Sequence, residues 1–98
     1  MDNSLSYADI IENTLKEATK DQPRIQSIRL YPVCDRPSGH FLILATGWDK
    51  KSWINTILFQ AHLSDRQITI EEDNFEEDLT SMLIAAGIDS KNIHTSVL

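Results

Sequence analysis

Cysteine and long hydrophobic runs are scarce in this sequence. Its 98 residues include one cysteine, Cys34, so no disulfide can form within the chain, and a reducing compartment such as the cytoplasm is the expected setting. The longest apolar stretch covers residues 41–45, far short of the roughly 20 residues that cross a bilayer as a helix. Residues 1–4 are acidic and polar, whereas a signal peptide combines positive charge with a long apolar run. We therefore expect neither membrane insertion nor export.

Positive charge is also scarce. The chain carries 9 Lys+Arg against 15 Asp+Glu, a net charge of −6, and its basic residues are scattered along the sequence. A protein that binds nucleic acid by itself usually gathers basic residues on one face, because the release of counterions from phosphates supplies much of the affinity. Direct nucleic-acid binding is therefore not favoured.

The composition that is present indicates one folded domain. Hydrophobic residues make up 41% of the chain and charged residues 24%, which are values typical of globular proteins. At this length, folding hides roughly two-thirds of the surface of the unfolded chain, enough for one core. We expect a single domain that spans residues 1–98.

The first helix is predicted by a capping box. Ser6 is followed three residues later by Asp9, and such a pair satisfies free N–H groups at the start of a helix. Leu5 and Ile10 have the spacing of a hydrophobic staple across the same cap. Apolar residues then recur at helical spacing as far as Ala18.

Four strands are predicted after this helix. They are marked by alternating or continuous apolar residues at positions 28–30, 40–47, 53–63 and 67–71. Pro32 either ends the first strand or places it at a sheet edge, and residues 34–39 have the composition of a loop. In the third strand, regular alternation would place Ile57 and Phe59 on the same face. The turns are short, so we expect antiparallel pairing.

A second helix is predicted near the C-terminus. Asn74 followed by Glu77 is a capping signal, the apolar residues between Phe75 and Ala86 share one helical face, and Gly87 is a suitable stop. None of the connections suits a parallel crossover. The predicted fold is α+β, with an N-terminal helix, a four-stranded antiparallel sheet and a C-terminal helix packed on the sheet.

Motifs for catalysis and metal binding are lacking. His40, His62 and His94 do not show the close pairing of zinc motifs, and Cys34 has no second cysteine to accompany it. Neither a glycine-rich phosphate loop nor a nucleophile elbow occurs. We therefore predict that the protein is not an enzyme, with no catalytic residues, no metal and no cofactor. A reactive Cys34 thiol is the less favoured alternative, since no neighbouring sequence feature supplies a base.

Acidic residues form a run at positions 71–73 and 76–78. Carboxylates are stabilised by the N–H groups and the dipole at the start of a helix, so a helix-capping cluster is the favoured interpretation. A cation site, or a hydrolytic site that uses Glu76 and Glu77, is the weaker alternative.

Two tryptophans flank one tight turn. Gly47, Trp48 and Asp49 precede the polar turn, and Trp53 follows it. Aromatic residues at strand ends often pack on their own hairpin, but tryptophan is also enriched among the residues that anchor protein partners. Both interpretations stay open, and Trp48, Asp49 and Trp53 are the predicted partner-binding residues.

Several of these segments together resemble the XisI-like family. The resemblance rests on Tyr7 with residues 10–11, on Ala-Thr-Gly-Trp-Asp at 45–49, on Phe-Gln-Ala-His-Leu at 59–63, on residues 68–73 and on residues 83–88. It implies an α+β fold and a factor that controls programmed excision of a DNA element in cyanobacteria, with no catalytic residues to carry over. Members of the family usually continue into a basic tail, whereas this chain ends at Leu98.

The resemblance also implies a partner. Members typically accompany an XisH-type nuclease-like protein, so we expect a regulatory protein that binds such a partner and forms a homo-oligomer. The alternative is a DNA-binding accessory factor in site-specific recombination, in which Arg24, Arg29, Lys50 and Lys51 touch phosphate.

Overall fold

A computed structural model describes residues 6–23 and 27–96. The elements in chain order are α1 (Tyr7–Ala18), β1 (Arg29–Asp35), β2 (His40–Asp49), β3 (Ser52–Ser64), β4 (Gln67–Asp73), α2 (Leu79–Ala85), the short 3-10 helix η1 (Ser90–Asn92) and β5 (Ile93–Thr95). No helix among the described residues is long and apolar enough to cross a membrane.

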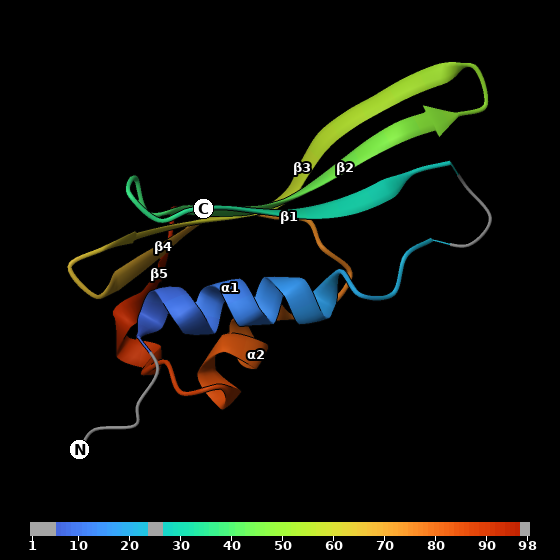
Figure 1. Cartoon of the computed structure of the whole chain (residues 1–98). Helices are drawn as coiled ribbons and strands as arrows, with labels where there is room; N and C mark the ends of the chain where they lie inside the picture. Colours follow the sequence, from blue (N-terminus) through green and yellow to red (C-terminus); the bar gives the residue numbers. More distant parts are fainter. Residues whose placement is uncertain (1–5, 24–26, 97–98) are drawn as a thin grey trace.

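One sheet with both helices on the same face makes up the fold (Figure 1). Its strands lie in the order β1-β2-β3-β4-β5, and β1 to β4 form the predicted antiparallel meander. The predicted α+β class is therefore confirmed. The β2–β3 hairpin projects beyond the neighbouring strands, and the sheet face opposite the helices carries no helix of the described chain (Figure 1).

The predicted strand count of four was one too low. Residues Ile93–Thr95 form a fifth strand that pairs in parallel with β4. The segment with α2 and η1 connects these two parallel strands, although the sequence analysis predicted no parallel crossover. The strand has only three residues, too few for the alternation of apolar residues that marks a strand to be visible.

Helix α1 begins as the capping box predicts. The Asp9 N–H donates to Ser6 Oγ at 3.2 Å, and the Ser6 N–H donates to Asp9 Oδ2 at 3.3 Å. Leu5, the other half of the predicted staple with Ile10, lies outside the described residues. The helix packs on the sheet through Ile11 and Leu15, which are fully buried.

The hydrophobic core lies between this helix, α2 and one face of the sheet. The sheet contributes alternate residues of its central strands, and the helices contribute apolar residues at helical spacing. Its largest fully buried side chains are Phe41, Phe59, Ile11, Leu15, Ile43, Ile68, Leu79, Leu83 and Ile88.

A bulge in β3 reverses the alternation expected there. Ile43 pairs with Phe59, but the next residue, Leu44, pairs with Ile57, so Leu58 is an extra residue on the longer strand. Ile57 consequently shares the outer face with Leu44, and the prediction that Ile57 and Phe59 lie on one face was wrong. A bulge adds one residue without changing composition, so the sequence pattern gives no sign of it.

Helix α2 begins later than predicted. Asp78 caps it, with its side chain accepting from the Ser81 N–H, whereas the Asn74 N–H donates to the Leu58 carbonyl at 2.7 Å and ties the end of β4 to the sheet. The predicted stop is confirmed, since the helix ends just before Gly87, which has φ of 124°.

Candidate interaction surface

The sheet face opposite the helices is the candidate site, and we name it the outer face. Residues on this face alternate with core residues along each strand. They include Arg29, Tyr31, Val33 and Asp35 of β1, His40, Leu42, Leu44, Thr46 and Trp48 of β2, and Trp53, Asn55, Ile57, Gln60 and His62 of β3.

Apolar side chains on the outer face meet across the strands. Val33 pairs with Leu42, and Tyr31 lies opposite Leu44, which in turn pairs with Ile57. Tyr31 and Val33 are 49% and 41% exposed. Such a group of apolar residues is an exposed patch of the kind that marks interaction sites on soluble proteins.

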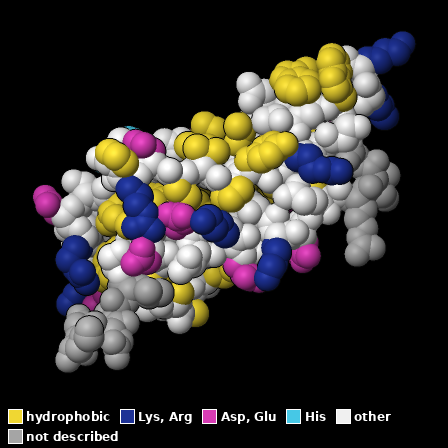
Figure 2. All heavy atoms as spheres, viewed as in Figure 1, with side chains coloured by type: hydrophobic (Ala, Val, Ile, Leu, Met, Phe, Trp, Pro, Cys, Tyr) yellow, Lys and Arg dark blue, Asp and Glu magenta, His cyan; other side chains and the backbone are white. Residues whose placement is uncertain are grey.

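The two predicted tryptophans lie together at the end of the β2–β3 hairpin. Trp48 pairs with Trp53 across the strands, and their rings meet edge to face with centroids 5.4 Å apart. They nevertheless stay 54% and 55% exposed. Hydrophobic side chains gather at the end of the hairpin beside basic ones (Figure 2). The two tryptophans therefore pack on their own hairpin and also stay exposed, so the two interpretations of the sequence do not exclude each other.

Gly47 and Asp49 hold the turn in place. Asp49 pairs with Ser52 at the mouth of the turn. Gly47 has φ of 146°, and a Cβ at this position would collide with the backbone of Ser27 and Ile28. Only glycine can adopt this φ and also leave room for the backbone of the neighbouring segment. Gly47 therefore fixes the path of β2 into Trp48.

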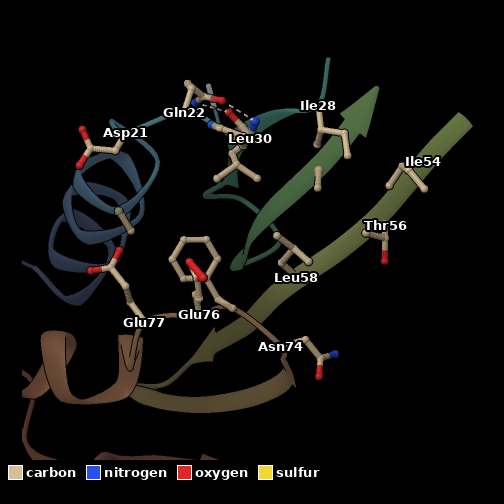
Figure 3. A pocket seen from close by; sticks show the side chains of 14 residues that line it. Asp21, Gln22, Ile28, Leu30, Ile54, Thr56, Leu58, Asn74, Glu76 and Glu77 are labelled. Carbon is tan, nitrogen blue, oxygen red and sulfur yellow. Dashed lines mark hydrogen bonds between the residues drawn. The ribbon is translucent and has the colours of Figure 1, made fainter. Parts of the chain in front are cut away.

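A groove lies on the helix side of the sheet, next to the C-terminal end of α1, where this helix no longer covers the strands. Its lining is largely apolar, with Ile28, Leu30, Ile54, Leu58 and Phe75. Its rim is acidic, with Asp21, Glu76 and Glu77 (Figure 3). Sequence reasoning missed this groove because its walls come from segments far apart in the chain.

Two histidines stack on the outer face. His40 pairs with His62, with ring centroids 4.4 Å apart and planes 13° apart. His40 Nδ1 lies 4.0 Å from Glu71 Oε1, which accepts a hydrogen bond from Gln60. The 21 residues between the histidines concealed this pair in the sequence. Among the described residues, no group of three or more His, Cys, Asp or Glu is placed to hold a metal ion.

The acidic run divides between three environments. Glu72 accepts from the Asn74 side chain, Asp78 caps α2, and Glu76 and Glu77 line the groove. Hydrogen bonds from the Ser81 side chain and backbone lower the pKa of Asp78. The helix-capping interpretation is therefore confirmed for Asp78 alone.

Cys34 lies in β1 rather than in the loop predicted for residues 34–39. It packs half-buried against the core. Burial is the main cause that raises the pKa of its thiol, and the negative charge of Glu12 acts in the same direction. A thiol with a raised pKa is a poor nucleophile at neutral pH.

The basic residues considered for phosphate contact do not gather on one face. Arg24 lies outside the described residues, and the Arg29 guanidinium donates to the carbonyls of Pro23 and Ile28. Lys50 and Lys51 form the turn of the β2–β3 hairpin. Among the described residues of this set, only Lys50 and Lys51 are adjacent, and they lie at the end of the hairpin.

The comparison with protein families matches almost the whole chain. Residues 1–97 fit the family model described as XisI protein. The chain belongs to the XisI family. No curated protein matches it.

Two solved structures resemble this XisI-family chain. A XisI-like protein from Anabaena variabilis has a TM-score of 0.81 at 15% identity, covering 94% of this chain and 84% of that one. The fdxN element excision controlling factor XisI from Anabaena variabilis has a TM-score of 0.64 at 23% identity, covering 95% of this chain and 94% of that one. Both show the fold.

Within this XisI-family fold, the outer face extends the predicted site. Of the three residues predicted to bind a partner, Trp48 and Trp53 lie on the outer face, whereas Asp49 pairs with Ser52 at the mouth of the turn. Tyr31 and Val33 belong to the same face but were not predicted. Residues 30–34 are all apolar, so the sequence shows no alternation that would have placed Tyr31 and Val33 on the exposed face.

Proposed function

We propose that this protein is a non-catalytic, cytoplasmic regulatory protein that helps to control excision of a DNA element by binding a nuclease-like partner of the XisH type. Membership of the XisI family supports the regulatory role, as does the description of one structural neighbour as an excision controlling factor. The outer face is the surface through which we propose that the partner binds.

One observation carries this proposal, namely the exposed apolar patch on the outer face. Trp48, Trp53 and Tyr31 are each about half exposed and share a face that no helix of the described chain covers. Aromatic residues with both an apolar body and a polar edge dominate the binding energy of protein interfaces. A sheet face of this kind can present several of them at fixed positions.

Binding to an XisH-type protein from the same organism tests the proposal. We expect a complex at micromolar concentrations, and we expect Tyr31→Ala and Trp48→Ala each to weaken it by roughly tenfold or more, because each removes about 1.4 kcal/mol or more of interface energy. Isothermal titration calorimetry measures the affinities. The matched control is Ile84→Ala, since Ile84 is also exposed, at 41%, but lies on α2.

Two results would contradict this assignment. The first is the absence of a complex at micromolar concentrations. The second is an equal loss of affinity in Ile84→Ala and Tyr31→Ala, which would mean that the outer face has no particular role in the complex.

Direct DNA binding is the second candidate, favoured by the position of Lys50 and Lys51 at the end of a projecting hairpin. Under this alternative the chain alone binds labelled duplex at low salt, binding weakens steeply as salt rises, and replacing both lysines by glutamine reduces that dependence. With a net charge of −6, we expect no such binding by the chain alone.

A further inference from the structure

We propose that a second copy of this chain adds to the free edge of β3 at residues 52–57, so that two sheets join into one. The joined sheet would contain ten strands, five from each copy. The proposal concerns the edge of the sheet, whereas the proposed XisH-type partner binds its outer face.

The free edge exists because β4 is shorter than β3. Strand β4 pairs with Phe59–Ser64 and ends at Asp73, after which the Asn74 N–H donates to Leu58 and the chain turns toward α2. Residues 52–57 pair with β2 on one side. On the other side, no strand within residues 6–23 and 27–96 pairs with them.

The hairpin turn determines which backbone groups face that edge. Lys50 and Lys51 form a two-residue turn, which makes Asp49 and Ser52 a hydrogen-bonded pair. Pairs alternate along an antiparallel ladder, so the N–H and C=O groups of Trp53, Asn55 and Ile57 point away from β2. These groups offer a ready template for another strand.

The edge of β3 lacks the devices that keep other edges from pairing. Native sheets protect exposed edges with charge, proline or very short strands. Edge strand β1 has Pro32 at its centre, and the edge strand β5 has three residues. Residues 52–57 read Ser-Trp-Ile-Asn-Thr-Ile, with no charge and no proline.

Hollows lie on both sides of this edge. On the helix side, Ile54, Thr56 and Leu58 line the groove (Figure 3). On the outer face, a second hollow is lined by Asn55 and Ile57 together with Leu44, Gln60 and Glu72. Side chains of a strand point alternately to its two faces, so an added strand would place its side chains in both hollows.

Charge complementarity favours a second copy as the occupant. An added β3 runs antiparallel to the first, and a two-fold axis near Ile54 and Asn55 brings the turn of each copy to the end of β4 of the other. Lys50 and Lys51 form no ion pair with a described residue.

The end of β4 supplies the opposite charge. Glu72 and Asp73 lie at the end of that strand, and Glu76 follows on the rim of the groove. Association of two chains that each carry a net charge of −6 is opposed by repulsion. Two lysine–carboxylate contacts related by symmetry offset that repulsion where the copies meet.

Light scattering across micromolar concentrations tests the proposal. We expect a mass of twice the 11.2 kDa chain. Asn55→Lys places a charge in the middle of the edge and should raise the dimer dissociation constant by roughly tenfold or more. The matched control, Tyr31→Lys, places the same charge on the outer face and should leave the dimer intact. Circular dichroism verifies that both variants fold.

A charge exchange identifies the occupant. Lys50→Glu with Lys51→Glu should weaken the dimer, and so should Glu72→Lys with Glu76→Lys. Mixing the two variants should restore dimers that contain one chain of each. Failure of the mixture to associate more tightly than either variant alone would overturn the antiparallel arrangement.

Other results would overturn the proposal as a whole. If the wild-type chain stays monomeric at every concentration, the second copy is not the occupant, and the edge is open to an extended segment of another protein. A dimer that survives Asn55→Lys but not Tyr31→Lys uses the outer face instead. Thr56→Lys places a charge on the same edge but on the groove side, so binding of an XisH-type protein to this variant shows whether the proposed function holds independently of the dimer.

Discussion

Gly47 determines the position of Trp48 because its backbone adopts a φ value that would strain any other residue. Its φ is 146°, and an added Cβ would lie 2.7 Å from Ile28 Cα. A substitution must therefore distort the backbone of β2 or displace the segment that precedes β1, and either movement shifts the base of the β2–β3 hairpin. A single residue thus connects stability with the geometry of the candidate surface.

We predict that Gly47→Ala lowers the free energy of unfolding by about 1–3 kcal/mol, the usual cost of a strained backbone conformation. Urea denaturation followed by tryptophan fluorescence measures it, and the native spectrum should also change because Trp48 moves. The control is Gly87→Ala, which is also strained by a positive φ of 124° but should lose less stability, because the nearest atom to an added Cβ is the flexible Ile10 Cδ1 at 3.5 Å. Equal losses in the two variants would show that the collision at Gly47 has no effect.

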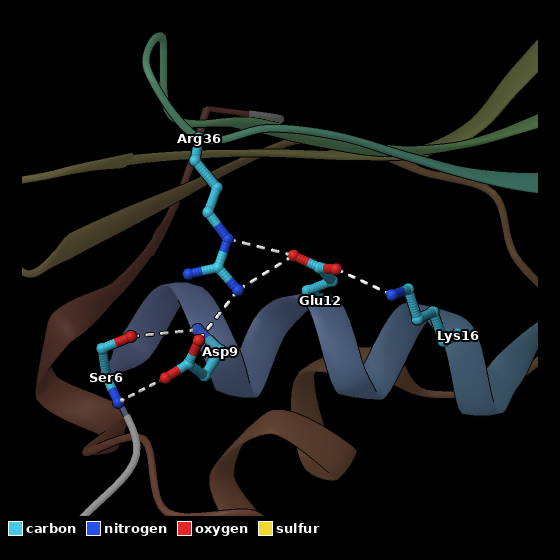
Figure 4. Close-up of polar contacts among 5 residues, drawn as sticks. All are labelled: Ser6, Asp9, Glu12, Lys16 and Arg36. Carbon is cyan, nitrogen blue, oxygen red and sulfur yellow. Dashed lines mark hydrogen bonds and ion pairs between the residues drawn. The ribbon is translucent and has the colours of Figure 1, made fainter.

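At the scale of elements, Arg36 ties the β1–β2 turn to α1 (Figure 4). Its guanidinium donates to Asp9 at 2.8 Å and to Glu12 at 2.9 Å, and Glu12 also pairs with Lys16 at 2.8 Å. Hydrogen bonding to Arg36 is the main cause that lowers the pKa of Asp9, and hydrogen bonding to Lys16 followed by Arg36 lowers that of Glu12. The network therefore stabilises both carboxylates in their charged form.

This network predicts a loss of stability in acid. Asp9 and Glu12 have folded pKa values below their ordinary 3.8 and 4.5, so their contribution is present above the ordinary values and is lost as pH falls through the lowered ones. We expect Arg36→Gln to be less stable than wild type at neutral pH and the difference to shrink below about pH 4. Urea denaturation across pH measures this difference.

The exposed pair of Lys20 with Glu17 provides the control for the acid experiment. Lys20→Gln should have little effect at any pH, because surface ion pairs are screened by water. If the difference between Arg36→Gln and wild type stayed constant from neutral pH to pH 3, the pairing of Arg36 with the carboxylates would not be the source of the stability.

Elements could be predicted from the sequence where a local signal decides the structure. Ser6 and Asp9 locate the start of α1, and short polar turns locate the meander. The start of α2 was misplaced because Asn74 and Asp78 both match a cap, and a contact with Leu58 in another strand decides between them. The bulge at Leu58 likewise depends on pairing between strands, which no local pattern contains.

At the scale of the whole molecule, the candidate surface was predicted only where sequence neighbours form it. Trp48 and Trp53 flank one turn and so could be recognised together, whereas Tyr31 joins them through the register of β1 with β2. The free edge of β3 could not be predicted at all, because it depends on where β4 ends. Features built by long-range pairing require the structure.

Tyr7 joins three distant parts of the molecule. Its hydroxyl accepts from the Asp89 N–H at 3.3 Å and from the Asn92 side chain at 2.9 Å, and the Arg66 guanidinium lies 4.2 Å from the centre of its ring. The hydroxyl thereby links α1 to the segment that leads into β5, the strand that the sequence did not predict. The same bonds, with that from Asp89 strongest, lower the pKa of Tyr7.

We predict that Tyr7→Phe lowers the free energy of unfolding by about 1 kcal/mol, because it leaves two partly buried donors without their acceptor. For a chain of this length that loss corresponds to a fall in Tm of about 4–8 °C. Hydrogen exchange should also show faster opening of residues 93–95, since Asn92, whose side chain donates to Tyr7, directly precedes β5. Tyr31→Phe removes the same hydroxyl from the exposed outer face and should change neither quantity. A fall in Tm without faster exchange in β5 would mean that Tyr7 stabilises α1 alone and does not hold the C-terminal strand against the sheet.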